Sequence, residues 1–303
     1  MQSETIRFLS RAAALLMLLA GFFNWHIAGV NADIGKYEII NNSKLTSMAV
    51  AQAEAVSEAA LSVSFNDILA QTSTPLLSNI PNRTHNIILS CKLINGAVIL
   101  PGAIFSFNQA VGIRTEDRGF KLAPTFINGQ VAESAGGGIC QLASTLYNAC
   151  VLSNLEIVSR TNHSMFADYF DKPGFDAAVS WGTIDYCFKN NTNNPIKIYA
   201  WVEDTVLFVE ITGTKMHDFT VDIESRIISI TPYETIYKKN FDLPQGQTKV
   251  IQEPHTGYVV ETYRVLKDTS GNIVNRTLEA RSIYNKTDEI IEHNSMSLLS
   301  LSM

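Results

Sequence analysis

Closely spaced cysteines are missing from this sequence. Its 303 residues include four cysteines, at positions 91, 140, 150 and 187, and no two of them form a CxxC pair. The spacing therefore gives no support to a zinc ribbon or a thioredoxin-like redox motif. On one helix Cys140 and Cys150 would lie about 15 Å apart, too far for a disulfide, whereas a bridge between Cys91 and Cys187 stays open. So low a cysteine density also argues against a disulfide-stapled scaffold.

An excess of positive charge is missing too. The chain has 23 Lys and Arg against 29 Asp and Glu, a net charge of −6. Because a nucleic-acid partner requires a basic surface, we expect none. There is no GxSxG elbow for a serine nucleophile. No ligand pair of the HxxxH kind supports zinc, although Cys140, His163 and an aspartate are the types of residue that bind it. We therefore expect no resident metal and no cofactor.

A long apolar run occurs at the N-terminus. Arg7 and Arg11 precede the run Ala12–Phe23, and the small residues of Val30-Asn31-Ala32 stand at the usual cleavage distance. Residues 1–32 are therefore expected to be a secretory signal peptide or a single membrane anchor. Either form exports the rest of the chain, to the outer face of the membrane or to the cell wall.

The remaining chain is globular in composition and long enough for two domains, since 46% of the residues are hydrophobic and 17% are charged. Alanine-rich residues 33–81 predict a helical stalk or linker. Residues 82–213 predict a main domain, residues 220–292 a small module of alternating strands, and residues 293–303 a tail. The expected fold class is α+β, with a main domain of mixed helices and antiparallel sheet and an all-β C-terminal module.

The stretch Glu133–Cys150 draws most attention. Its three glycines, Gly136 to Gly138, run into a segment with apolar residues at helical spacing, which places Cys140 in the first turn of a helix. Backbone N–H groups of a glycine turn and the helix N-terminus both favour a thiolate, and they can also hold an oxyanion. The alternative is that Cys140 packs as a small hydrophobic residue. Helical spacing puts four polar residues on the face opposite the apolar one: Gln141, Ser144, Thr145 and Asn148.

A cysteine nucleophile needs a base. Of the six histidines only His85 and His163 fall in the main domain, and His163 follows the strand predicted after the cysteine helix. Asp176 and Asp185 come soon after, and either would orient the imidazole. The order cysteine, histidine, acid is that of small papain-like and transglutaminase-like enzymes, an analogy at the level of the fold.

Several separate segments carry a resemblance. In chain order they read PGAIFSFNQAVGIRTEDRGFKLAPTFINGQVAESAGGGICQLASTLYNA, LEIVSRTNHS and FDAAVSWGTIDYCFKNNTNNPIKI. From about residue 82 to residue 213 the chain resembles the VanW domain, named from an accessory protein of glycopeptide (vancomycin B-type) resistance clusters. Residues 220–291, including ESRIISITPYETIYKKNFDLPQGQTKVIQEPHTGYVVETYRV, resemble a G5 domain.

The resemblance implies a bacterial cell-envelope protein. G5 domains imply sugar binding, with N-acetylglucosamine-containing polymers as the ligand. Carried over by position, the GGGxCQ motif falls on Gly136–Gly138, Cys140 and Gln141, and the HS motif on His163 and Ser164. The DAxVxxGxxD aspartates fall on Asp176 and Asp185. Trp181 and Cys187 depart from the family pattern, which affects packing more than chemistry.

Two functions follow as hypotheses. The first is a cysteine peptidase or transpeptidase of peptidoglycan, linked to glycopeptide resistance, with Cys140 as nucleophile, His163 as base and Asp185 or Asp176 as orienting group. The second is a non-catalytic protein that binds peptidoglycan, muropeptides or wall sugars. Structural support of an envelope complex is a third reading. The ligand-binding residues expected from the motifs are Gly136, Gly137, Gly138, Gln141, Ser144 and Ser164.

Overall fold

The computed structural model describes residues 65–76, 80–127, 130–167 and 169–294. The expected signal segment, most of the expected stalk and the tail after residue 294 lie outside these residues. No helix in the described ranges combines the length and the apolar character that crossing a membrane requires.

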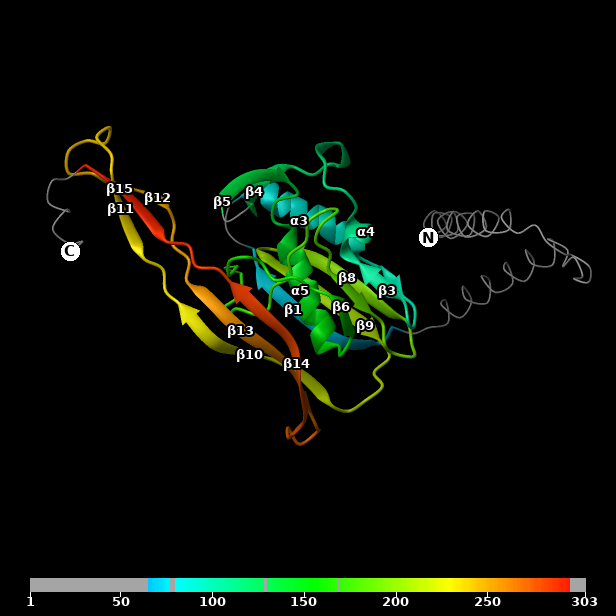
Figure 1. Ribbon diagram of the computed structural model, residues 1–303. Helices are drawn as coiled ribbons and strands as arrows, with labels where there is room; N and C mark the ends of the chain where they lie inside the picture. The colour runs from blue at the N-terminus through cyan, green and yellow to red at the C-terminus, as the bar shows by residue number, and fades with distance from the viewer. Residues whose placement is uncertain (1–64, 77–79, 128–129, 168, 295–303) are drawn as a thin grey trace, which may run out of the picture. The chain divides into compact units, whose positions relative to one another are not determined.

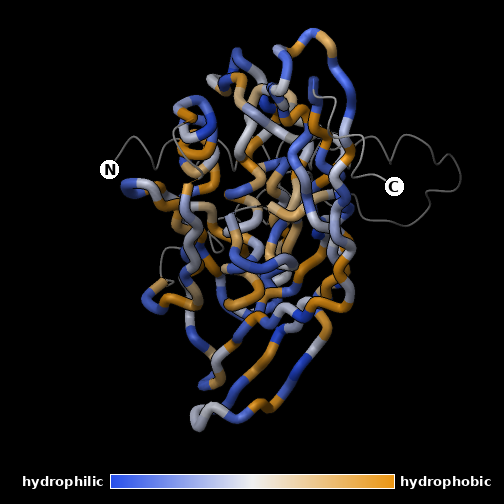
Figure 2. Tube along the Cα trace, turned by 90° about the vertical axis from the view of Figure 1, so that its left-hand side faces the viewer, coloured by the Kyte–Doolittle hydropathy of each residue, from blue (hydrophilic) through white to orange (hydrophobic). Residues whose placement is uncertain are grey.

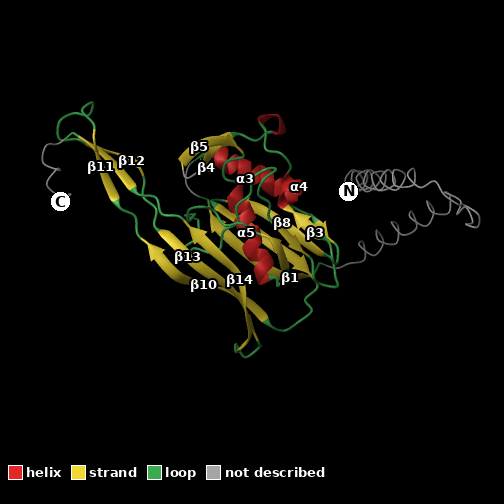
Figure 3. Cartoon of the chain, viewed as in Figure 1, coloured by secondary structure: helices red, strands yellow, loops and turns green. Residues whose placement is uncertain are grey.

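Strands outnumber helices in this part of the chain (Figure 3). In chain order the elements are β1 (Asp67–Pro75), α3 (Pro81–Ile94), β2 (Val98–Ile99), β3 (Ile104–Ser106), α4 (Phe107–Val111), the 3-10 turn η1 (Glu116–Arg118), β4 (Leu122–Ile127), β5 (Gln130–Ala135), α5 (Ile139–Leu152), β6 (Glu156–Ser159), β7 (Cys187–Lys189), β8 (Ile196–Glu203), β9 (Val206–Gly213), β10 (Thr220–Thr231), β11 (Thr235–Lys239), β12 (Thr248–Gln252), β13 (Gly257–Lys267), β14 (Ile273–Tyr284) and β15 (Glu289–His293).

The main domain is built on an antiparallel sheet with strand order β1-β9-β8-β2 (Figure 1). Helix α5 contacts β1 and β9, and α3 contacts β8 and α5. Over most of β8 and β9, buried residues alternate with partly exposed ones, which is the pattern of a sheet with one covered face. The domain contains both helices and antiparallel sheet as predicted, but it is richer in strand than the sequence suggested.

Strand β1 corrects the prediction of a helical stalk up to residue 81. Residues 67–75 form an edge strand that pairs with β9, from Asp67 opposite Gly213 to Pro75 opposite Val206. Thr74 is buried, and its hydroxyl lies 2.9 Å from that of Thr145 on α5. The reason is tertiary: the apolar content of the segment is low, and its hydrogen-bond partners come from a strand far along the chain.

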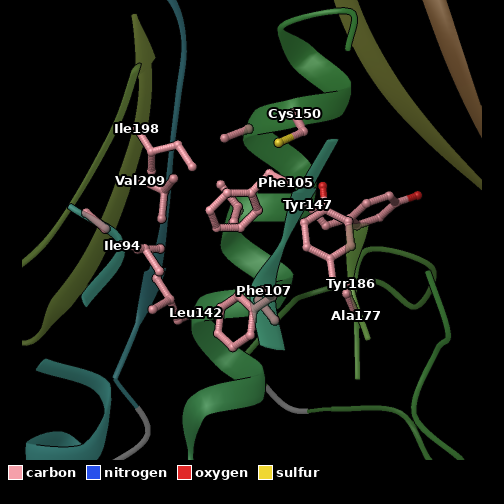
Figure 4. Close-up of a cluster of buried hydrophobic side chains, with 14 of the residues drawn as sticks. Ile94, Phe105, Phe107, Leu142, Tyr147, Cys150, Ala177, Tyr186, Ile198 and Val209 are labelled. Atoms are coloured by element: carbon pink, nitrogen blue, oxygen red, sulfur yellow. The ribbon is translucent and has the colours of Figure 1, made fainter. Parts of the chain in front are cut away.

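Helix α5 is buried on all sides, which corrects the expectation of one polar face. Gln141, Ser144 and Thr145 are fully buried and Asn148 nearly so. Each of the four has hydrogen-bond partners, as buried polar groups require. Figure 4 shows apolar side chains gathered on both sides of the helix, with Ile198 and Val209 on one side and Tyr186 on the other. A helix in this position is a central core element.

Two smaller groups of paired strands complete the main domain. One is a sheet with order β3-β7-β6, and the other is the hairpin of β4 and β5, which leads into the glycine run. Residues 177–181, which lie between β6 and β7, form no regular strand in the described structure. That segment is irregular, with a single bridge between Ser180 and Ile184, and it passes the start of α5.

The C-terminal module is all β, as predicted. One sheet has the order β10-β13-β14, and a second has the order β11-β15-β12, in which β11 and β15 are parallel. Figure 2 shows short hydrophobic and hydrophilic segments alternating along the chain. Strand β13, in the centre of its sheet, is buried or partly buried throughout, whereas β11 and β12 are exposed over almost their whole length.

Strand β14 lies against a loop of the main domain. The Arg160 guanidinium donates to the Ser282 hydroxyl at 2.6 Å, and the Asn162 amide donates to the Ile283 carbonyl at 2.8 Å. The Asn285 N–H donates to the Ser164 carbonyl at 2.7 Å. The module therefore holds the loop on which His163 is placed.

Candidate active site

The glycine run fixes where α5 begins. Gly136 and Gly138 have φ angles of 86° and 101°, a region that residues with a side chain rarely adopt, and Gly138 is the residue before the helix. A Cβ on Gly137 would lie only 2.4 Å from the carbonyl oxygen of Ala123, so β4 passes directly over the loop. Cys140 follows in the first turn of the helix, as the spacing predicts.

The Cys140 side chain is partly buried and faces the irregular segment. Its Sγ lies 3.5 Å from both the backbone nitrogen and the carbonyl oxygen of Val179. The Val179 N–H donates to the sulfur, which favours the thiolate. The backbone N–H of Cys140 has no acceptor among the described residues. It is therefore a free donor next to the sulfur.

His163 faces Cys140 with one side of its ring and Asp176 with the other. Its Nδ1 lies 2.6 Å from the Asp176 Oδ2, and its backbone N–H donates to the same oxygen at 2.6 Å. The imidazole and the Cys140 thiol lie close enough for each to shift the pKa of the other. The three residues thus form a chain of thiol, imidazole and carboxylate, the arrangement that activates a cysteine nucleophile.

The environment moves the pKa values of the pair in opposite directions. Burial raises the pKa of Cys140, but the hydrogen bond and charge of His163, the Val179 N–H and the charge of Arg114 outweigh it, so the net shift is downward. Burial lowers the pKa of His163, but Asp176 and Cys140 outweigh it and raise the pKa to about 10. A thiolate beside an imidazolium is the form these shifts favour near neutral pH.

In the other three cysteines the pKa of the thiol is raised. Like Cys140 they are free thiols. Burial raises the pKa of Cys91 and of Cys150 to about 12. Burial and the neighbouring Asp185 raise the pKa of Cys187 to about 11. Only Cys140 among the four has the environment of a nucleophile.

Asp176 is held from several sides. It is 1% exposed, and its Oδ1 accepts from the Arg160 guanidinium at 3.2 Å and from the Tyr284 hydroxyl of β14. Burial raises its pKa, but His163 and Arg160 outweigh burial and lower it. Because both oxygens are engaged in this way, the carboxylate orients the imidazole and is not available as a ligand of a shared metal ion.

Asp185, the other predicted orienting group, lies elsewhere. Its Oδ2 accepts from the Ser106 hydroxyl at 2.5 Å and its Oδ1 from the Asn108 N–H at 2.8 Å. It therefore fixes the start of α4 and does not contact His163. Of the two aspartates left open by the sequence, Asp176 is the one that the fold brings to the histidine.

The predicted ligand residues are mostly used within the fold. Gly136 and Gly137 donate their N–H groups to the carbonyls of Lys121 and Ser134, at 3.2 and 3.1 Å. They therefore do not form the anion-binding nest that the sequence suggested. Gly138 serves as the residue before α5, where its positive φ is required. All three glycines nevertheless line the cleft described below.

The polar residues expected to bind ligand differ in whether their side chains are buried or face the cleft. The Gln141 amide bonds Arg83, Thr74 and Pro75 at 2.7–2.9 Å, and the Ser144 hydroxyl, also buried, bonds Tyr169 and Ala177. Both are structural in this geometry. Ser164 is exposed and lines the cleft, so it stays a candidate for ligand contact.

A cleft of about 800 Å³ opens over Cys140 and His163. Its wall includes the glycine run, the loop around His163, the segment around Val179 and two arginines, Arg83 and Arg114. Sequence reasoning missed both arginines as well as Arg160 and Tyr284. Arg114 stands in the charged segment RTEDRGFK, and none of the four residues stands in a motif that marks a site.

Comparisons with known proteins agree with the resemblance. Residues 82–212 match the family described as VanW like protein, and residues 223–294 match the G5 domain. The chain is 47% identical over 132 residues to the uncharacterized protein YoaR of Bacillus subtilis (strain 168), a match that covers 44% of this chain and 43% of that protein. It is 30% identical over 140 residues to the vancomycin B-type resistance protein VanW of Enterococcus faecalis (strain ATCC 700802 / V583), covering 44% of this chain and 50% of that one. The matches thus span half or less of the length of these relatives.

Two solved structures of G5 domains also match. The crystal structure of HP0197-G5 is 18% identical and covers 25% of this chain and 99% of that chain, with a TM-score of 0.16. An IgA1 protease G5 domain structure is 22% identical and covers 26% of this chain and 93% of that chain, with a TM-score of 0.19.

Proposed function

Because the chain carries a VanW-like domain at residues 82–212 followed by a G5 domain at residues 223–294, we propose that it is an exported cell-envelope protein that uses Cys140 for acyl transfer on peptides of peptidoglycan. The observation that carries the enzymatic part is the chain of contacts from Cys140 through His163 to Asp176, set in an open cleft. The reaction class is peptide-bond cleavage or exchange.

The geometry supports a two-step reaction. The Cys140 thiolate attacks the carbonyl carbon of the substrate and a bond forms between sulfur and carbon, while the electron pair of the carbonyl moves to its oxygen. The free N–H of Cys140 is placed to donate to that oxyanion. When the intermediate collapses, the carbon–nitrogen bond breaks and the His163 imidazolium gives its proton to the leaving amine.

In the second step His163, now neutral, takes a proton from water or from an acceptor amine. The activated oxygen or nitrogen attacks the thioester and releases the Cys140 thiolate. Water as acceptor gives a peptidase, and an amine gives a transpeptidase. Asp176 keeps the same ring nitrogen of His163 protonated in both steps.

The second part of the proposal is wall binding by the C-terminal module. Several aromatic side chains of this module are exposed, among them Tyr233, Tyr237 and Phe241 at 43%, 49% and 75%. Exposed aromatic rings of this kind suit contact with the apolar faces of sugar rings. The proposed partner is a polymer that contains N-acetylglucosamine, and residues 1–32 would serve as signal peptide or anchor. The name of one relative, the vancomycin B-type resistance protein VanW, suggests a link to glycopeptide resistance.

The test is digestion of purified peptidoglycan by the full-length protein, followed by mass spectrometry of the released or exchanged muropeptides. We expect products from the wild type and none from Cys140→Ala or His163→Gln, while all three sediment with the wall. Products that persist in Cys140→Ala would contradict the enzymatic reading. Wall binding without products from any of the proteins would favour the non-catalytic binding protein.

A further inference from the structure

Beside Cys140 the cleft is lined by two arginines whose guanidinium groups have buried nitrogens without a hydrogen-bond partner in the described structure. We infer that Arg83 and Arg114 form a carboxylate-binding subsite, which selects peptides with a free carboxylate close to the bond attacked. This inference rests on the proposed acyl transfer, since it names the substrate class for that same cleft.

Of the two arginines, Arg114 gives the stronger evidence for this subsite. All three nitrogens of its guanidinium are buried, and none has a hydrogen-bond partner among the described residues. The group lies over the rings of Phe107 and Trp181, at 5.8 and 5.9 Å from their centroids. A buried guanidinium is normally paired, because taking its charge out of water is costly. The pairing group is therefore to be supplied by a ligand.

Arg83 completes the subsite from α3. It is 8% exposed, and one of its terminal nitrogens donates to the Gln141 side chain at 2.7 Å. The other, Nη1, is buried and has no acceptor in the part of the chain that the structure describes. Because Gln141 is itself held by Thr74 and Pro75, the free donor has a fixed position. Such preorganisation suits a planar anion with two oxygens.

The glycine run brings the two arginines to the nucleophile. A Cβ on Gly136 would lie 2.8 Å from the Cγ of Arg114, and a Cβ on Gly138 would lie 2.5 Å from the Cγ of Arg83. The stems of both arginines therefore lie against the loop that leads into Cys140. The glycines leave room for these stems.

Two anionic groups of the chain come into question as the missing partner. Burial lowers the pKa of the Arg114 guanidinium. The charge of Asp185 raises that pKa and so opposes the effect of burial, but the oxygens of Asp185 accept from Ser106 and Asn108. The Cys140 thiolate also raises that pKa. Neither lies within hydrogen-bond distance of the guanidinium. A test must therefore separate attraction of a ligand carboxylate from stabilisation of the thiolate.

Two alkylating reagents make that separation. Iodoacetate carries a carboxylate and iodoacetamide does not, and both react with the same thiolate, so the ratio of their rate constants is independent of the thiolate fraction. We expect the rate constant for iodoacetate divided by that for iodoacetamide to be higher at Cys140 than for free glutathione. Arg114→Gln should lower it about 10- to 100-fold, the size of a hydrogen bond to a charged group. Arg226→Gln, an exposed arginine of β10 outside the cleft, is the matched control. An unchanged ratio in Arg114→Gln would overturn the inference.

A binding measurement keeps the two proposals distinguishable. The Cys140→Ala protein would be titrated with acetyl-alanyl-alanine and with its C-terminal amide, in the L and D series. Binding would be followed by the fluorescence of Trp181, which is 48% exposed. We expect the acid to bind at least about tenfold more tightly than the amide, and Arg114→Gln to remove the difference. Trp181→Phe identifies the signal. Equal responses, or no saturable response to the acid, would overturn the subsite even if Cys140 proves catalytic.

Folding of the variants has its own readout. Because Arg114 is buried without a partner, its replacement by glutamine is expected to leave the melting temperature unchanged or to raise it. Arg114→Lys keeps the charge but loses the planar fork, so it should retain only part of the preference for the acid.

Discussion

Cys140 and Cys150 lie on the same helix and differ in almost everything that decides reactivity. Both are removed from water to a large degree, and burial pushes the pKa of each upward. At Cys150 burial dominates and the pKa rises to about 12, whereas at Cys140 an imidazolium, a backbone N–H and a guanidinium reverse the shift. Burial alone makes a cysteine inert. A buried cation beside it produces a nucleophile.

Removal of the cation should make Cys140 resemble Cys150, and this is the largest effect we expect. The lowered pKa of Cys140 implies an iodoacetamide labelling midpoint below the free-thiol value of about 8.5. In His163→Gln the burial and the charge of Arg114 remain but the imidazolium, the larger of the two cationic effects, is lost, so the midpoint should rise above that value. Turnover should fall by about 10²- to 10⁴-fold. Labelling against pH with mass spectrometry of the Cys140 peptide measures the midpoint.

The control for this variant is His85→Gln. His85 is partly exposed on α3, and its Nε2 lies 2.8 Å from the Gly119 carbonyl oxygen, away from the thiol. Its replacement should leave the midpoint of Cys140 unchanged. Equal midpoints in the wild type and His163→Gln would show that the two side chains do not act as a pair.

The next largest effect concerns the carboxylate behind the histidine. Asp176→Asn leaves the buried Arg160 without its counter-ion and should cost about 3–5 kcal/mol of unfolding free energy, measured with denaturant. The pKa of Asp176 is lowered in the fold, so its contribution is present above the ordinary value of about 3.9 and is lost as the pH falls through the folded-state value. The wild type and the variant should therefore converge in acid. A constant gap down to pH 2 would contradict this account.

A smaller effect is expected across the boundary between the domains. Tyr284→Phe leaves the ring in place but removes the hydrogen bond that its hydroxyl donates to Asp176 and the one that it accepts from the Gly174 N–H at 2.8 Å. The expected loss is about 1–2 kcal/mol of stability, with a modest upward move of the Cys140 labelling midpoint. Tyr233→Phe, on an exposed tyrosine of the same module, is the control. Identical midpoints in the two variants would assign Tyr284 a purely structural role.

The smallest effect is expected from a substitution at Cys150, the inert cysteine of the pair. Cys150→Ala removes a buried sulfur from the core and should cost about 1 kcal/mol of unfolding free energy. The labelling midpoint of Cys140 and the turnover should not change. A shift of that midpoint would mean that the two ends of α5 are coupled more closely than their contacts indicate.

The sequence carries the local part of this structure well. Helical spacing places α5 and Cys140 in its first turn, and alternation places the hairpin of β8 and β9 and the strands of the C-terminal module. These features depend on residues that are close in the chain. The pairing of Cys140 with His163 is also readable, because a helix followed by a strand brings the chain back to the helix start.

The rest depends on contacts between distant residues. Which aspartate meets His163 is decided by contacts that form only in the fold, because no pattern in the sequence distinguishes Asp176 from Asp185. Strand β1 finds its partner more than a hundred residues away, on β9. Arg114 resembles any arginine of a charged loop, because what distinguishes it is burial without a partner. Tyr284 reaches the site from another domain altogether.

The glycine run has a consequence for how this chain can change. The space that each glycine leaves is taken by an arginine stem: Arg114 fills the space beside Gly136, and Arg83 fills the space beside Gly138. The two members of each couple are therefore not independent variables for mutation. An alanine at 136 is compatible with the cleft only if the residue at 114 shortens or withdraws, which would remove the charge along with the bulk. Any redesign of this loop that aims at a new substrate must treat the small residues and the cations as one unit.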